Sequence, residues 1–229
     1  ELIYDLAVIC AGSAGLTAAE FGAQLGLRVA LVEKDRIGGD CTWTGCVPSK
    51  TLIRSAKIAH YQGTGSSYGL SDFLPQVDFP AVMQRVQDVI ATIAPKDSMQ
   101  RYRELGVECI AGDATLLDPH HVAVGDTTLS TRSIVLATGA TPFVPPIPGL
   151  VEAQPLTSDN LWQLDSLPER LLVMGGGPIG CELAQSFARL GARVTLIDME
   201  QRLLPREDQD VSEFMADVFR AEGINVLLG

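Results

Sequence analysis

Hydrophobic and polar positions near the start of the chain predict a strand, a turn, a helix and a second strand. Tyr4 to Ile9 is a short apolar run, and glycines punctuate residues 12–15. Leu16 to Gly26 has the composition of a helix, and Leu27 to Glu33 is apolar and β-branched. This order of elements predicts a βαβ unit whose turn is rich in glycine.

The same pattern recurs in the last third of the sequence. Arg170 to Met174 is apolar, three glycines follow, Ile179 to Leu190 has helical spacing, and Arg193 to Asp198 reads as a strand. The two copies start about 165 residues apart by alignment of their patterns. The sequence therefore predicts an internal repeat of one supersecondary unit.

The segment between the copies is predicted to be helical first and then antiparallel. We expect one helix from Pro48 to about Tyr61, a polar loop over residues 62–76 and a second helix from Pro80 to Leu105. Short runs with glycine and aspartate punctuation then predict a small meander, followed by a buried strand. The runs are Val107 to Ile110, Ala114 to Leu117, His121 to Val124 and Thr127 to Ser130, and the buried strand is Ile134 to Ala137.

Four prolines between 142 and 148 predict a linker, so we expect domains over residues 1–150 and 151–229, with the boundary between 145 and 165.

Composition narrows the possible partners. The 229 residues are 46% apolar, which suits a globular protein with a buried core. A formal charge of −11 argues against nucleic acid and anionic membranes as partners. No apolar run approaches the length of a membrane span, and residues 1–5 lead directly into a predicted strand without a signal peptide. These features predict a cytoplasmic protein.

The two glycine turns carry the first chemical signal. The first, from Cys10 to Gly15, lacks the first glycine of the G-x-G-x-x-G fingerprint, whereas the second, from Gly175 to Gly180, is complete. Glu33 and Asp198 each lie 18 residues past the last glycine, where a carboxylate can accept protons from ribose hydroxyls. One such turn is compatible with an ordinary βαβ connection, but two copies favour two dinucleotide sites.

Cys41 and Cys46 carry the second signal. They are separated by four residues, lie beside Gly38 and Gly39, and stand at the start of a predicted helix. Two thiols at this spacing can close a small ring, so we predict a disulfide in the oxidised protein. A thiolate at a helix N-terminus is stabilised by the free amides, which lowers the pKa of such a thiol. A purely structural or buried reduced pair is the alternative, and no cysteine or histidine spacing predicts a zinc site.

Taken together, these motifs resemble the flavin-dependent pyridine nucleotide-disulfide oxidoreductases. The resemblance rests on the first glycine turn with Glu33, the stretch from Gly38 to Lys50, residues 137–140, and the second glycine turn with Asp198. The run from Val47 to Lys50 and the helix beyond it look closest to mercuric-reductase-like members. The segment Asp40-Cys41-Thr42-Trp43-Thr44 departs from the commoner Thr-Cys-x-Asn-x pattern of the family.

The resemblance implies an α/β fold with a Rossmann-type FAD-binding domain and a small antiparallel meander, followed by an incomplete second Rossmann-type unit for NAD(P)H. The expected FAD-binding residues are Gly12, Ser13, Ala14, Gly15, Glu33, Lys34, Gly39, Asp40, Lys50, Ala114, Ala137, Thr138 and Gly139. The expected nicotinamide-cofactor residues are Gly175, Gly177, Pro178, Ile179, Gly180 and Asp198.

The resemblance also implies catalytic roles for four residues. Cys46 would face the flavin, and Cys41 would exchange with substrate. Lys50 lies four residues past Cys46 on the same helical face, and Glu182 would pair with it near the flavin; a solvated surface lysine is the alternative. No arginine immediately follows Asp198, which favours NADH, although Arg202 is close enough to leave NADPH open.

The expected reaction passes electrons between NAD(P)H, flavin and the cysteine pair, with mercuric ion or a small disulfide as substrate. A dihydrolipoamide dehydrogenase is one alternative, a flavin enzyme with accessory cysteines is another, and a non-catalytic dinucleotide-binding fragment is a third. Relatives in the family continue into a homodimerisation domain beyond the matched part. We therefore expect the full-length protein to be the active enzyme and the 229-residue form to be inactive.

Overall fold

The structure is a computed structural model that describes residues 3–229, so Glu1 and Leu2 of the predicted entry into the first strand lie outside it. Contacts divide the chain into two compact units. Unit 1 contains the residues up to Pro48 together with Asp88–Leu161, and unit 2 contains Ser49–Gln87 together with Trp162–Gly229. The division into residues 1–150 and 151–229 was drawn from the proline-rich linker and not from contacts, and it stays a prediction.

Unit 1 is built on a six-stranded sheet with the order β3-β2-β1-β6-β5-β4. Strands β1, β2, β3 and the second half of β6 run parallel, while β4, β5 and the first half of β6 form an antiparallel meander. The bounds are β1 (Tyr4–Ile9), β2 (Val29–Glu33), β3 (Glu108–Ala111), β4 (Ala114–Asp118), β5 (His121–Val124) and β6 (Thr127–Leu136). This arrangement confirms the α/β class and the small meander.

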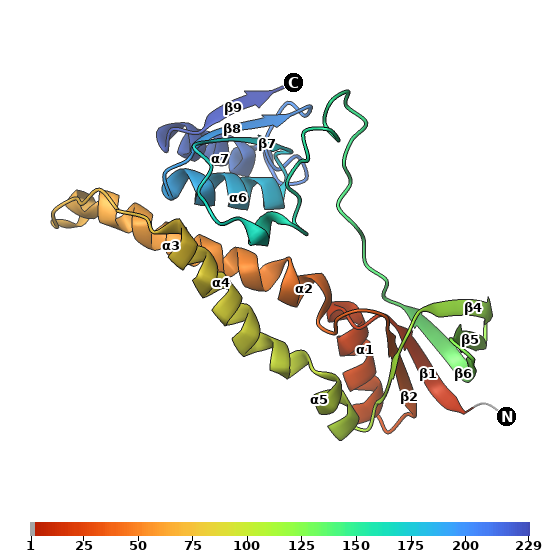
Figure 1. The fold of residues 1–229 in the computed structure, drawn as a ribbon. Coiled ribbons are helices and arrows are strands. Elements are labelled where there is room, and N and C mark those ends of the chain that lie inside the picture. The colour runs from red at the N-terminus through yellow and green to blue at the C-terminus, as the bar shows by residue number, and fades with distance from the viewer. Residues whose placement is uncertain (1–2) are drawn as a thin grey trace. The chain divides into compact units, whose positions relative to one another are not determined.

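The parallel sheet of unit 1 is buried on both faces. Helix α1 (Ser13–Gln24) lies against β1 and β2, as Figure 1 shows. On that face Val8 and Leu31 pack with Leu16 of α1. Neighbouring side chains of a strand point to opposite faces, so Ile9 and Val32 pack instead against the meander. The carboxyl end of β1, where the glycine turn begins, is therefore held from both sides.

Two further segments of unit 1 hold the cysteines and their surroundings. Helix α2 (Gly39–Trp43) contains Cys41, and helix α3 (Cys46–Gly63) begins at Cys46 and continues into unit 2. The 3-10 segment η2 (Ala94–Asp97) and helix α5 (Met99–Glu104) lead into β3.

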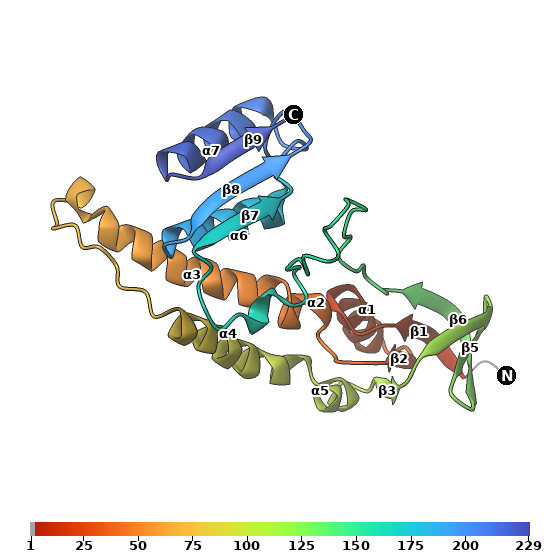
Figure 2. The ribbon, with the colours of Figure 1, turned by 45° about the horizontal axis from the view of Figure 1, so that its top comes forward.

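Unit 2 combines a helical hairpin, Ser49–Gln87, with the second repeat. Its three parallel strands have the order β7-β8-β9, and Figure 2 shows α6 and α7 on the same side of them. Phe79 of the hairpin and Phe187 of α6 pack with ring centroids 6.0 Å apart. The bounds are η1 (Gly65–Tyr68), α4 (Phe79–Ile93), η3 (Leu161–Gln163), β7 (Arg170–Met174), α6 (Pro178–Arg189), β8 (Arg193–Asp198), α7 (Gln209–Ala221) and β9 (Asn225–Leu228). Within residues 3–229, no helix is long and apolar enough to cross a membrane.

Most of the repeat was predicted well, but the middle of the chain needs four corrections. The single helix expected from Pro80 to Leu105 is three segments, α4, η2 and α5. Pro95 lies at the start of η2, and Ser98 is extended and caps α5 by accepting from the Arg101 N–H, so a continuous helix cannot form there. The loop over residues 62–76 also contains η1.

The strand expected from Val107 to Ile110 does not belong to the meander. It is β3, which pairs in parallel with β2 because α5 precedes it as a crossover. The runs expected at 127–130 and 134–137 form one strand, β6, which pairs with β5 through its first half and with β1 through its second. The prediction failed because the polar residues Thr131 to Ser133 resemble a turn in sequence.

Candidate active site

The first glycine turn brings backbone amides to one end of the unit 1 sheet. Gly12 precedes α1 as its N-cap, and a Cβ atom at Gly15 would lie 1.9 Å from the carbonyl oxygen of Cys10. Only glycine fits at position 15, so the turn is tight. The first turn of α1 has no acidic residue, which leaves its N–H groups suited to a phosphate.

Cys10 occupies the position of the missing fingerprint glycine. Its φ is +75°, in the left-handed region that favours glycine, and its half-buried side chain packs against the cluster that contains Ile9 and Val32. Burial, and secondarily the charge of Glu33, raises the pKa of the Cys10 thiol. The turn therefore keeps its glycine-like backbone despite the side chain.

Glu33 closes the turn from the neighbouring strand. Its buried carboxylate accepts the Ala11 N–H at 2.6 Å and the Asp35 N–H at 2.9 Å. Each carboxylate oxygen has a second lone pair, so Glu33 can still accept from a ribose hydroxyl. Lys34, which was also expected at this site, pairs with Asp113 at 3.4 Å and is largely exposed.

Two glycines place the cysteine segment directly against this turn. The Gly38 N–H donates to the Ala11 carbonyl at 2.8 Å, and a Cβ atom at Gly39 would lie 2.6 Å from the Cα atom of Gly12. Both glycines have positive φ, 104° and 55°. The contact therefore needs glycine at position 39. It places Asp40 and Cys41 beside the glycine turn.

A cavity of about 370 Å³ lies where these segments meet. Its walls come from the glycine turn, from α2 and from the residues after β6. Parallel pairing of Ile9 with Leu136, and the bond from the Ala137 N–H to the Ile9 carbonyl at 3.0 Å, bring the ends of β1 and β6 together. The lining residues are Gly12, Ser13, Ala14, Asp40, Cys41, Leu136, Ala137, Thr138 and Gly139.

Eight of the nine lining residues were expected from the sequence, and Leu136 was missed. Leu136 directly precedes Ala137 and ends the strand beside β1, so parallel pairing of the two strands could have revealed it. Gly15, Glu33, Lys34, Gly39 and Ala114 do not line the cavity. Gly15 and Gly39 act through close packing, while Ala114 is the first residue of β4.

Cys41 lies half-buried in the cavity wall, and Cys46 is exposed at the first position of α3. All five cysteines of the sequence are thiols in the structure, and the disulfide between Cys41 and Cys46 stays a prediction. Cys109 and Cys181 are buried, and burial raises the pKa of both thiols, that of Cys181 to about 11. These two are poor nucleophiles, in contrast to the exposed Cys46.

Lys50 and Glu182 form an ion pair within unit 2. The Lys50 Nζ atom lies 2.7 Å from both carboxylate oxygens of Glu182. The pairing expected from the resemblance is present, while its role beside a flavin stays a prediction. Both side chains are substantially exposed, so the pair contributes only about 0.2–1 kcal/mol to stability.

The second glycine turn repeats the first within unit 2. Gly175 has a φ of +112°, Gly177 precedes Pro178 as N-cap of α6, and a Cβ atom at Gly180 would lie 1.9 Å from the Gly175 carbonyl oxygen. Asp198 accepts the N–H groups of Gly176 and Glu200. Ile179 is exposed in the first turn of α6, which has no acidic residue there.

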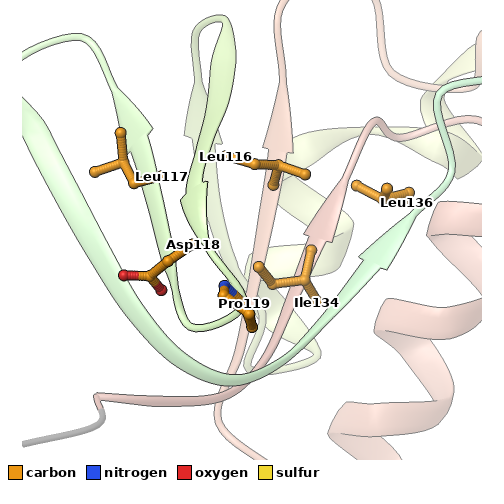
Figure 3. A pocket seen from close by; sticks show the side chains of 6 residues that line it. All are labelled: Leu116, Leu117, Asp118, Pro119, Ile134 and Leu136. Atoms are coloured by element: carbon orange, nitrogen blue, oxygen red, sulfur yellow. The ribbon is translucent and has the colours of Figure 1, made fainter.

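A second cavity, of about 490 Å³, lies elsewhere in unit 1 (Figure 3). Its walls are apolar except for Asp118, which accepts the His120 N–H at 2.7 Å and pairs with the His121 ring at 2.8 Å. Although it is larger, this cavity offers no convergent set of polar groups, so the smaller one is the better candidate. Across residues 3–229, no cluster of His, Cys, Asp and Glu side chains could hold a metal ion.

Two Rossmann-type units with a cysteine pair beside the first glycine turn define a dinucleotide-dependent dithiol protein. The family described as "Pyridine nucleotide-disulphide oxidoreductase" matches residues 4–229. The chain belongs to this family, in which FAD and a pyridine nucleotide are the usual cofactors.

Several longer proteins are similar over nearly the whole chain. A mercuric reductase of Lysinibacillus sphaericus is 34% identical over 226 residues, covering 99% of this chain and 41% of the relative. A dihydrolipoyl dehydrogenase of Mycoplasma genitalium is 34% identical, covering 98% and 50%. The HOCl-induced flavoprotein disulfide reductase RclA from Escherichia coli has a TM-score of 0.80 at 32% identity, covering 98% and 49%. The chain thus spans about half the length of these relatives.

Proposed function

We propose that this chain is the FAD-binding and dithiol-bearing part of an NAD(P)H-dependent oxidoreductase that acts on mercuric ion or a small disulfide. The observation that carries the proposal is the cavity in which Cys41 meets the glycine turn, Asp40 and residues 137–139. A cysteine at the wall of a dinucleotide site is suited to exchanging electrons with the cofactor. The likeness to mercuric reductases favours mercuric ion as the substrate.

The glycine turn fits a dinucleotide because its glycines carry no side chains. A pyrophosphate can therefore approach the backbone N–H groups at the start of α1. The N–H groups at the start of α1 would bind the phosphates, and Glu33 would accept a ribose hydroxyl. When bound, FAD supplies the two-electron relay between a reduced nicotinamide and the cysteine pair. Residues of this chain would position the two thiols and stabilise the negative charge that develops on them.

Each catalytic residue has a distinct role in this proposal. Cys46, at the N-terminus of α3, would hold a thiolate that the helix amides stabilise. Cys41 would exchange with the substrate, as the family resemblance implies, and pass electrons to it from Cys46. Lys50 would stabilise negative charge that develops on the reduced cofactor, and Glu182 would hold the Lys50 side chain in place.

The second unit would bind the nicotinamide cofactor, with a preference for NADH. Asp198 would accept a ribose hydroxyl, and Glu200 follows it closely, so a 2′-phosphate would meet negative charge. Arg202, the nearest cation along the chain, donates to the Pro205 carbonyl at 2.8 Å. This bond supports the preference because it engages the side chain that could otherwise bind a 2′-phosphate.

The other candidate activity is that of a dihydrolipoamide dehydrogenase, since such relatives are equally similar in sequence. We propose a homodimer and a cytoplasmic location for the full-length enzyme. The 229-residue form is expected to lack disulfide or mercuric reductase turnover, because general acid–base help worth roughly 10²- to 10⁴-fold comes from residues outside it in the family.

The test is a visible spectrum of the purified chain with added FAD, followed by partial reduction. Bound flavin with a long-wavelength band that depends on Cys46 supports a flavin–dithiol site. Flavin without that band would make the cysteines accessory, and no flavin binding would leave a dinucleotide-binding module without this chemistry. NADH oxidation with mercuric ion plus excess thiol, or with oxidised lipoamide, then separates the two substrates in the full-length enzyme.

A further inference from the structure

Helix α2, which carries Cys41, is too short to define its own position. It has five residues, and glycines precede and follow it at positions 38 and 45. A helix of this length closes little more than one turn, so its placement depends on side chains that reach other segments. Two residues supply such contacts, Thr42 and Trp43, and Trp43 is also a position at which this chain departs from the commoner family pattern.

Thr42 anchors α2 to the segment that follows α4. Its side chain is 2% exposed, and its hydroxyl donates to the Asp97 carboxylate at 2.7 Å. Asp97 is half-buried at the end of η2, 55 positions away in sequence. A buried hydroxyl without an acceptor would cost about 1–3 kcal/mol, so this bond selects one position of α2.

Trp43 anchors the other end of α2 to the loop after β2. Its indole N–H donates to the Ile37 carbonyl at 2.8 Å, and the Arg36 guanidinium lies 4.7 Å from the ring centroid. Arg36 and Ile37 belong to the short loop between Glu33 and Gly38. The residues directly after Cys41 are therefore fastened on two sides.

In this position, the backbone segments that precede and follow Cys41 are in contact with each other. The Thr44 and Gly45 N–H groups both donate to the Asp40 carbonyl. A Cβ atom at Gly45 would lie only 3.5 Å from the Cα atom of Cys41. The residue before Cys46 thus packs against Cys41, which keeps the backbones of the two cysteines near each other.

We propose that Thr42 and Trp43 are positioning residues that hold Cys41 close to Cys46 and thereby strengthen their disulfide. The inference rests on the proposed function of this pair as the redox-active dithiol. Restricting one thiol near another raises its effective concentration, which favours the intramolecular disulfide over the two separate thiols. With glutathione disulfide as the oxidant, the two thiols together give up two electrons and two protons. The products are the Cys41–Cys46 disulfide and two molecules of reduced glutathione.

The experiment measures the equilibrium between this dithiol and glutathione in the 229-residue chain, with Cys10, Cys109 and Cys181 followed separately by mass spectrometry of the alkylated peptides. Thr42→Val should lower the equilibrium constant for Cys41–Cys46 disulfide formation about tenfold, which corresponds to a potential about 30 mV less negative. Thr42→Ser keeps the hydroxyl and should restore the wild-type value. Thr92→Val makes the same chemical change at an exposed helical site and should have no effect.

Two more variants test the contacts from their other sides. Asp97→Ala removes the acceptor without altering α2, and it should weaken the disulfide as much as Thr42→Val, with no further loss in the double variant. Trp43→Phe keeps a ring for Arg36 but loses the indole N–H, so a smaller shift of about threefold is expected.

The outcomes separate this inference from the function beneath it. A wild-type pair that titrates normally, with Thr42→Val and Asp97→Ala unchanged, would overturn the positioning role alone. A wild-type pair that forms no disulfide at any glutathione ratio would overturn both the redox-active dithiol and the inference that depends on it. A stronger disulfide in the variants would also contradict the inference, because the contacts would then hold the thiols apart.

Discussion

The two glycine turns of this chain share one backbone plan. In each, an acidic residue at the end of the second strand accepts an N–H of the turn, from Ala11 to Glu33 and from Gly176 to Asp198. The last glycine of each turn approaches a carbonyl oxygen so closely that a Cβ atom would lie 1.9 Å away. The same local geometry is thus formed twice, although Cys10 replaces the glycine that stands at position 175 in the second copy.

The difference lies in the segment that covers each turn. The Ala11 carbonyl accepts the N–H of Gly38, which leads into α2 and Cys41. The Gly176 carbonyl instead accepts the N–H of Leu204, at the same distance of 2.8 Å. Leu203 is fully buried, and a Cβ atom at Gly176 would lie 2.8 Å from it. Glycines cover the first turn and lead to the cysteine pair, whereas leucines cover the second. A shared scaffold can therefore serve two tasks when only the covering segment changes.

The largest expected effect comes from filling the close approach in either turn. Gly15→Ala should reduce flavin binding at least a hundredfold, because the backbone must move to admit the Cβ atom. Gly180→Ala has the same clash in unit 2, and it should weaken NADH binding while leaving flavin binding intact. Equilibrium dialysis of each variant with FAD and with NADH measures both effects.

Gly63→Ala provides the control for these variants, since a Cβ atom there meets nothing within 4 Å. It should bind both cofactors like the wild type. If Gly180→Ala lost FAD and Gly15→Ala lost NADH, the two units would have to exchange their assigned cofactors.

The acidic partners should differ in how much stability they supply. Glu33→Ala leaves the buried Ala11 N–H without its acceptor, so the free energy of unfolding should fall by about 1–3 kcal/mol. Asp198 is less buried, and water can replace part of its bonding, so Asp198→Ala should cost less. Urea unfolding of both variants without cofactor tests the ranking. Equal losses would mean that burial does not distinguish the two turns.

Alkaline pH should weaken unit 1 through a group that unit 2 lacks. Burial, and secondarily the bond to Glu108, raises the pKa of Tyr4 to about 12, while β7 begins with Arg170 instead. The folded state holds the phenol proton more tightly than the unfolded state, in which the pKa is about 10. The stabilisation is therefore complete below pH 10 and is lost as the pH rises toward 12, by about 1–2 kcal/mol.

Tyr4→Phe cannot ionise, so its stability should change less than that of the wild type between pH 10 and 12. Thermal unfolding across that range measures the difference. Parallel pH curves for the two proteins would show that the raised pKa of Tyr4 does not contribute to unfolding.

The smallest effect is expected where the two turns differ in sequence. Cys10→Gly removes a side chain from a left-handed position, but it also loses packing against the cluster that contains Ile9 and Val32. The two changes oppose each other, so we expect a stabilisation of no more than about 1 kcal/mol. The opposite change, Gly175→Ala, should destabilise by about 1–2 kcal/mol. A large loss in Cys10→Gly would mean that packing outweighs backbone strain at this turn.

The repeat could be predicted from sequence because its signals are local. The apolar run from Tyr4 to Ile9 and the one from Arg170 to Met174 match their strands, and each glycine turn lies where its pattern predicts. The eight expected residues at the cavity were found through turn chemistry and family resemblance, not through knowledge of the walls. These signals suffice wherever neighbours in sequence are also neighbours in space.

Prediction failed where pairing between distant segments decides the structure. Nothing near Val107 reveals that β3 joins β2 instead of β4, because the choice depends on a crossover through α5. The bond between Thr42 and Asp97 joins residues 55 positions apart, and neither residue has a sequence pattern that indicates the other. Leu136 was missed for the same reason, since its place at the cavity depends on β6 lying beside β1.

Strand β6 has a consequence for how unit 1 opens. One strand belongs to the meander through Thr127 to Ser130 and to the parallel sheet through Thr131 to Leu136, and Thr131, at the crossover, is fully buried. Neither layer can detach by local fraying without breaking a strand that the other layer shares. Amide hydrogens on both halves of β6 should therefore exchange with solvent deuterium at one common slow rate, as members of a single cooperative unit.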